Sequence, residues 1–371
     1  MGTAQGFFLP VVSSFMTRWF PAAERSSVIA VYTMGNQASN VIGAPLAAFL
    51  CKQRQFYGGW PVIFYLYAFC GLLWCVLFGL LVENNPTKSR LVKGQEWELL
   101  RVQMEQQYLR NREAVRPKAV PWARMAGSPP LWACTVSLVA FSAGMVTIVF
   151  YLPTYYRDVL ELDLTQNGLF TSLPHLSMFL CKVIFAWLAD RLKTATNLDH
   201  TSICKLFNGI ACFGNVAGLV ATSFVDCRHP ALGMAAMCLC LGSAAAFPAG
   251  YMTSQVTIAP LYAGTIVSIT LVFAEVASIL TPQFVGFATP DGTRGEWRVV
   301  FLSVAALYAF SGIFFQVFGS AELQPWALRE NDKAKLENSR DLETLQGVTT
   351  DNHNSTTGKK EGREEAISTL Q

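Results

Sequence analysis

The chain has 371 residues, and its 28 Lys and Arg against 25 Asp and Glu give a formal net charge of only +3 at pH 7. Hydrophobic residues make up 52% and charged residues 14%, whereas an ordinary soluble domain holds about 25% charged residues. This composition excludes a typical soluble protein and gives no reason to expect binding to nucleic acid. The apolar residues form runs of about twenty, the length a helix needs to cross a hydrocarbon core of ~30 Å.

The apolar runs predict an all-α polytopic membrane protein. Lipid-exposed backbone must satisfy its own hydrogen bonds, and the runs are too long and continuous for barrel strands, so the spans are expected to be helices. In chain order, nine spans are predicted at 1–20, 26–50, 60–82, 131–152, 166–189, 203–224, 231–251, 261–288 and 299–320.

Polar segments divide these spans into groups. Residues 1–82 contain three spans, and the hydrophilic residues 83–128 separate them from the six spans within 129–324. Residues 325–371 are polar and lack a hydrophobic face, so they are predicted to be a disordered tail. Basic residues concentrate in the 83–128 loop and in the tail, and the positive-inside rule therefore places both in the cytoplasm.

The span at 26–50 contains no charge beyond its ends, but it carries the polar side chains Asn36, Gln37, Ser39 and Asn40. Asn36 and Asn40 are four residues apart and share one helix face. Buried amides need partners, so the two asparagines either join helices together or line an aqueous path. Asn36 and Asn40 are the better candidates of the four for the path.

Two charges lie deep inside the predicted spans, Lys182 and Glu275. A charge at the bilayer centre costs roughly 2.5 to 3.5 kcal/mol on insertion scales, so each needs a reason. His175 precedes Lys182 by seven residues, an offset of about 20°, and both project from nearly one face. One hypothesis makes Lys182 an anion counter-charge, Glu275 a proton carrier and His175 a titrating neighbour. The alternative is a structural Lys182–Glu275 pair, or a lysine that reaches the interface.

Seven segments in order carry a resemblance to a known family: "RWFPAAERS" (18–26), "GGWPVIFYLYAFCGLLW" (58–74), "VPWARMAGSPPLWA" (120–133), "LPTYYRDVL" (152–160), "NGLFTSLPHL" (167–176), "DGTRGEWRVVF" (291–301) and "AELQPWA" (321–327). Together they resemble the anion:cation symporter family of the major facilitator superfamily, which includes sialin-like, vesicular glutamate and sodium-phosphate transporters. The resemblance implies two six-helix halves joined by a cytoplasmic loop. The nine spans then correspond to helices four to twelve, and the first three helices are expected to be missing, most simply through an incomplete gene model.

The same resemblance assigns places to the candidate residues. It places Lys182 on the eighth helix and Glu275 on the eleventh, where both can border the central cavity. In "WLADRLK", Asp190 and Arg191 stand where the superfamily keeps a charged cytoplasmic loop, which implies a gate on that side; a simple basic flank is the alternative. The chain also departs from the family, because Thr257 stands where an aspartate is expected.

The sequence therefore predicts a secondary active transporter of anions, either inorganic phosphate or small organic anions, working by sodium- or proton-coupled alternating access. Its partners are a small anionic solute and the lipid bilayer of a plasma, lysosomal or vesicular membrane. Enzymatic activity is not expected, since the sequence has no metal cluster, phosphate loop or nucleophile elbow, and no cofactor is expected beyond the coupling ion. The alternative is a truncated, non-transporting membrane protein that associates with or regulates a full-length relative.

Overall fold

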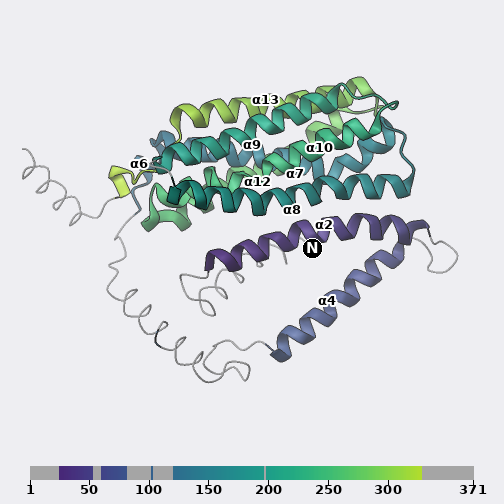
Figure 1. The fold of residues 1–371 in the computed structure, drawn as a ribbon, viewed down its shortest axis with the longest axis horizontal. Coiled ribbons are helices and arrows are strands. Elements are labelled where there is room, and N and C mark those ends of the chain that lie inside the picture. The colour runs from purple at the N-terminus through teal and green to yellow at the C-terminus, as the bar shows by residue number, and fades with distance from the viewer. Residues whose placement is uncertain (1–24, 53–59, 82–101, 103–119, 196–197, 328–371) are drawn as a thin grey trace, which may run out of the picture.

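The computed structural model describes residues 25–52, 60–81, 102, 120–195 and 198–327, and the described part is helical (Figure 1). The helices are α2 (Arg25–Lys52), α4 (Pro61–Leu81), α6 (Trp122–Ala126), α7 (Pro129–Asp158), α8 (Leu164–Ala195), α9 (His200–Ser223), α10 (Pro230–Ala244), α11 (Tyr251–Thr257), α12 (Ala263–Ala288) and α13 (Arg294–Phe318). Short 3-10 turns are η2 (Phe247–Ala249), η3 (Pro260–Tyr262) and η4 (Pro325–Ala327).

Seven segments in the described ranges are long and apolar enough to cross a membrane, and each overlaps a predicted span. One of them, Pro230–Thr257, joins α10 to α11 through η2, where Pro248 interrupts the helix. The predicted span at 1–20 lies outside the described residues. The predicted span at 26–50 is a helix, α2, but it is not among the seven apolar segments, because its polar residues lower its hydropathy.

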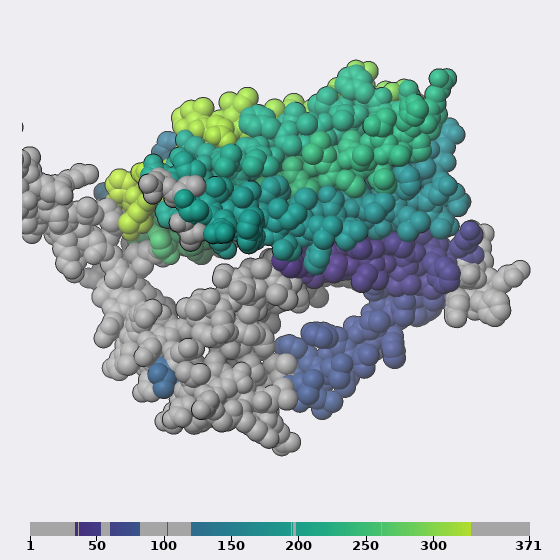
Figure 2. Space-filling model, viewed as in Figure 1, coloured from purple at the N-terminus to yellow at the C-terminus, as the bar shows by residue number. Residues whose placement is uncertain are grey.

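The six spans from α7 to α13 form one bundle, and α2 lies along its side against α8 (Figures 1 and 2). Inside the bundle α9 packs against both α10 and α13, and α7 packs against α12 and α13. By contrast, none of the residues of α4 is buried, and α4 contacts the described chain mainly through α2.

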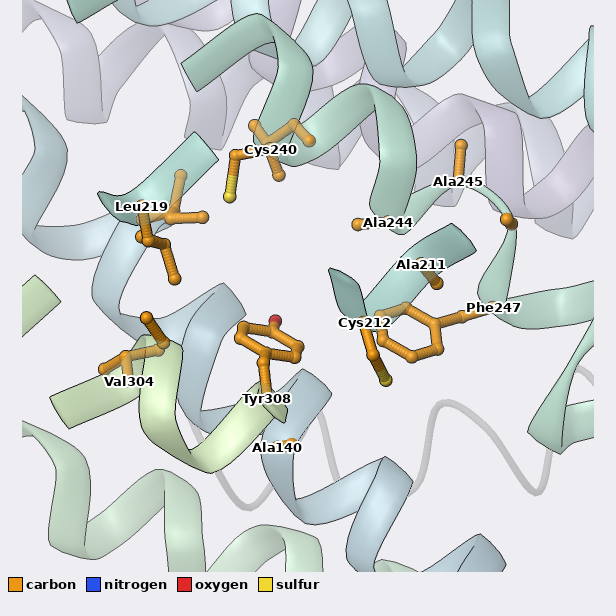
Figure 3. Close-up of a cluster of buried hydrophobic side chains, with 14 of the residues drawn as sticks. Ala140, Ala211, Cys212, Leu219, Cys240, Ala244, Ala245, Phe247, Val304 and Tyr308 are labelled. Atoms are coloured by element: carbon orange, nitrogen blue, oxygen red, sulfur yellow. The ribbon is translucent and has the colours of Figure 1, made fainter. Parts of the chain in front are cut away.

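Small residues let the helices of the bundle approach one another around a few large rings. Figure 3 shows Tyr308 of α13 and Phe247 of η2 among the alanines and cysteines of α7, α9 and α10. The two rings stack with centroids 6.2 Å apart, and Phe247 also meets Phe141 of α7 edge to face at 5.1 Å. Because lipid and these side chains are similarly apolar, close van der Waals packing is what holds such helices together.

We expect Gly218→Ala to destabilise the bundle by about 1–3 kcal/mol, because overpacking a tight contact forces backbone to move. A Cβ added at Gly218 would lie 2.7 Å from the Ala236 carbonyl oxygen and 2.9 Å from the Cys240 backbone nitrogen, and neither atom can turn away. The matched control is Gly286→Ala, where the added Cβ would have no neighbour within 4 Å. Thermal unfolding in detergent measures both; equal melting temperatures would contradict this α9–α10 contact.

Candidate functional site

The contact between α2 and α8 joins the two groups of spans. A Cβ added at Gly168 of α8 would lie 2.7 Å from the Ala48 Cβ and 3.1 Å from the Ala44 carbonyl oxygen. Ten residues further along α8, the Met178 sulfur accepts a hydrogen bond from Gln37 Nε2 at 3.8 Å. Since the contacts advance along α8 while they retreat along α2, the helices are antiparallel. Figure 1 shows them closer at the end that holds Lys52 than at the end that holds Arg25.

His175 belongs to the face of α8 that meets α2. It follows Gly168 by seven residues, so the two side chains differ by only about 20° around the helix. On α2, the residues seven positions before Ala44 and Ala48 are Gln37 and Val41, and the antiparallel register set by the Gly168 and Met178 contacts puts this part of α2 opposite His175. The His175 side chain is only 2% exposed, and its Nδ1 has no hydrogen-bond partner among the described residues.

Lys182 continues the same face of α8, seven residues beyond His175, and its side chain is half-buried. Neighbouring residues Val183, Ile184 and Trp187 are exposed. No ion pair of Lys182 occurs within the described ranges. A half-buried ammonium without a carboxylate is expensive in a membrane span unless water or an anion reaches it.

Glu275 is exposed on α12. The helix turns the neighbouring Ala274 and Ser278 toward α7, where the Ser278 and Ser142 hydroxyls lie 2.7 Å apart. Lys182 and Glu275, both described, do not form an ion pair, so the structural pair considered as an alternative is not found. The structure therefore does not join these two charges.

The structure describes the burial of two of the three amide side chains predicted on α2. Asn40 is half-buried and engaged in a contact, while the side chain of Asn36 lies outside what the structure describes. The sequence ranked Gln37 behind Asn36 and Asn40 as a candidate for the aqueous path. In the structure Gln37 is buried against α8, with only 5% of its surface exposed. The sequence could have predicted this burial. Gln37 lies seven residues before Ala44 and eleven before Ala48, and small residues at that spacing mark a close helix contact.

The two residues of the predicted gate lie near the end of α8. Asp190 Oδ1 is 3.5 Å from Lys193 Nζ, three residues along the same helix, and the Asp190 side chain is 79% exposed. Arg191 is exposed as well. Exposed pairs of this kind are worth about 0–1 kcal/mol, so this ion pair by itself holds no two helices together.

Thr257, which stands where the family resemblance expects an aspartate, is satisfied within its own helix. Its hydroxyl donates to the Thr253 and Ser254 carbonyl oxygens at 3.0 and 3.1 Å. Two residues earlier, Gln255 Nε2 donates to Thr270 Oγ1 at 2.9 Å and so joins α11 to α12. In the described part of the chain, no group of three or more His, Cys, Asp or Glu is placed to hold a metal ion.

Long apolar helices in one bundle, with a further helix packed on its side through buried polar groups, define a multi-pass integral membrane protein. The chain belongs to the major facilitator superfamily, whose family model matches residues 1–282. This is a superfamily of membrane transporters and not of enzymes.

Among curated proteins, the chain is similar to sialin of Homo sapiens, with 31% identity over 330 residues that cover 89% of this chain and 64% of sialin. A putative inorganic phosphate cotransporter of Drosophila melanogaster is 30% identical, covering 90% of this chain and 62% of that protein. Vesicular glutamate transporter 2.1 of Danio rerio is 28% identical, with 88% and 55% covered. The chain spans less than two thirds of the length of these relatives. The expected resemblance to the anion:cation symporter family is confirmed.

Among solved structures, the chain resembles a bacterial homologue of the human lysosomal transporter Spinster. The inward-facing, occupied form superposes with a TM-score of 0.51 at 12% identity, covering 83% of this chain and 73% of the other. The inward-facing, unoccupied form gives a TM-score of 0.52 at 14% identity, with 84% and 75% covered. This likeness confirms the expected major facilitator fold.

Proposed function

We propose that this protein moves small anions across a membrane by alternating access, as a secondary active transporter driven by a sodium or proton gradient. The spans within 1–82 and within 129–324 act as the two moving halves, joined by residues 83–128. The observation that carries the proposal is Lys182, a half-buried ammonium without an ion pair in the described ranges, on the α8 face that meets α2. The relatives named sialin and phosphate cotransporter also support an anionic solute, inorganic phosphate or a small organic anion.

The remaining candidates take roles around this lysine. Lys182 is the counter-charge for the anion, His175 and Asn40 border the path, and Glu275 carries the coupling proton if the driving ion is a proton. Asn36 shares this path by its position on α2. Asp190 and Arg191 form the gate on the cytoplasmic side, where the loop of residues 83–128 and the tail of residues 325–371 also lie. The membrane is the plasma membrane or that of a lysosome or vesicle.

Uptake into proteoliposomes that contain the purified protein tests this proposal. Labelled phosphate, glucuronate and glutamate are offered separately, first with an inward sodium gradient and then with an inward proton gradient. We expect at least one anion to accumulate above its external concentration with one of the gradients, and to leave again when an ionophore collapses that gradient. Uptake no faster than into empty liposomes, for all three anions and both gradients, contradicts the proposal. The non-transporting alternative then becomes the one to pursue, through co-purification with a full-length relative.

A further inference from the structure

The α2–α8 contact holds two buried polar atoms, one from each helix. Gln37 Oε1 and His175 Nδ1 are both without a hydrogen bond among the described residues. Their side chains are 5% and 2% exposed, and they come from facing helices in the two groups of spans. A buried polar group left without a partner costs about 1–3 kcal/mol. Two such atoms at one helix contact therefore indicate a site where a small ligand supplies the missing hydrogen bonds.

The chemistry of the two atoms defines what the ligand must offer. A thioether sulfur accepts but cannot donate a hydrogen bond, so the Gln37 amide must direct its NH2 group at Met178. This leaves Oε1, which only accepts, for the ligand. His175 Nδ1 donates or accepts according to its tautomer. A hydroxyl group, which donates one hydrogen bond and accepts others, suits both atoms, whereas an anion without any hydrogen-bond donor cannot serve Gln37.

Lys182 lies close enough to act on the same ligand. Its Cα is about 10 Å from that of His175 along the axis of α8, at 1.5 Å per residue. Side chains on a helix lean toward its N-terminus, so a Lys182 side chain that follows this tendency reaches back toward Met178 and His175. An anionic group held by the ammonium can therefore present an attached hydroxyl to the Gln37–His175 pair.

We infer that Gln37 and His175 form a selectivity site that recognises the O–H group of an anion whose charge Lys182 holds. The site rests on the proposed anion transport and narrows its substrate class to hydroxyl-bearing anions. Both a P–OH of hydrogen phosphate and a C–OH of a hydroxylated carboxylate have this chemistry. Because α2 and α8 belong to different groups of spans, the ligand also bridges the two groups when it binds.

Two pairs of matched anions test the inference by competition against labelled uptake in proteoliposomes. Phosphate and sulfate share size and shape, but sulfate carries no O–H at neutral pH. Glucuronate and cyclohexanecarboxylate are both ring carboxylates, and only the first has hydroxyls. We expect the hydroxyl-bearing member of at least one pair to bind about 10- to 100-fold more tightly, the factor that one unsatisfied buried group gives. The pair that shows the preference identifies an inorganic or an organic substrate.

The variant Gln37→Met keeps the size of the side chain but removes the accepting oxygen, and we expect it to lower that preference to less than about threefold. His175→Phe provides a second variant with the same expected loss. The control is Ser39→Ala, because Ser39 is exposed on another face of α2 and is expected to leave the preference unchanged. Melting temperatures of the purified variants establish that each one is folded.

The possible outcomes separate this inference from the proposed function. Wild-type uptake with no preference in either pair, as expected if only water fills the site, overturns the inference alone. A preference that survives in both Gln37→Met and His175→Phe does the same. If the wild-type protein takes up no anion, the proposed function falls and the inference falls with it.

Discussion

Lys182→Met is expected to reduce anion uptake at least about thirtyfold, because removing the charged partner of a bound ion costs about 2–5 kcal/mol. Methionine is similar in length and apolar, so membrane insertion should improve. The melting temperature in the absence of anion should not fall either, because Lys182 has no ion pair in the described part of the chain. A purely structural lysine would instead show a lower melting temperature together with its loss of uptake.

The matched control for this prediction is Lys205→Met. Lys205 is half-buried in α9, and its backbone carbonyl oxygen accepts a hydrogen bond from Gln316 Nε2 at 2.7 Å, which the substitution does not remove. This variant is expected to keep wild-type uptake. Initial rates of labelled uptake, normalised to the amount of protein in the liposomes, compare the two. If Lys182→Met shows wild-type uptake, Lys182 is not part of the anion path.

Gly168→Ala is expected to slow uptake about tenfold, because an overpacked contact costs about 1–3 kcal/mol and disfavours the state in which that contact is closed. The added methyl group would lie 2.7 Å from the Ala48 Cβ, which forces α2 and α8 apart at this end. Alternating access requires the two groups of spans to close here in part of the cycle. Uptake should therefore fall even though Gly168 carries no polar group.

The exchange of the two residues tests this steric explanation. In a protein with both Gly168→Ala and Ala48→Gly, the contact with the Ala48 methyl group is removed and only the 3.1 Å approach to the Ala44 carbonyl oxygen remains. Uptake should therefore rise severalfold above that of Gly168→Ala if the clash with Ala48 limits it. Gly35→Ala, where an added Cβ on α2 meets nothing within 4 Å, should have no effect. If the exchanged protein stays as slow as Gly168→Ala, the close approach of α2 and α8 is not what limits uptake.

The sequence was sufficient to predict the helices of the fold, because a span needs only length and apolarity. Seven apolar segments overlap the predicted spans, and Pro248 lies at a break between α10 and α11. The α2 helix differs from the others. It is a helix as predicted, but its polar residues lower its hydropathy, so it is not among the seven apolar segments. Polar residues in such a helix signal a contact with protein rather than with lipid.

The candidate site was only partly predictable, because one helix face does not say which other helix it meets. The seven-residue spacing placed His175 and Lys182 together on α8, but it did not reveal that Gly168 extends this face to α2. Gln37 is buried on α2 although it was placed behind Asn36 and Asn40, and the side chain of Asn36 lies outside what the structure describes. Likewise, the sequence offered Glu275 as a partner of Lys182, and only the packing of α12 on α7 shows that the two do not pair.

The most direct test of the account is whether position 182 lies on a water-filled path that anions enter. In a protein with Lys182→Cys and the ten native cysteines replaced, a membrane-impermeant cationic thiol reagent is added from one side of sealed liposomes and then from the other. We predict modification that proceeds from at least one side. The transported anion should slow it only at concentrations about thirtyfold above those that saturate the wild-type protein, because the variant lacks the Lys182 ammonium, and the matched competitor without a hydroxyl should not slow it. A cysteine at this position that reacts from neither side, or at a rate that no anion changes, would contradict the account.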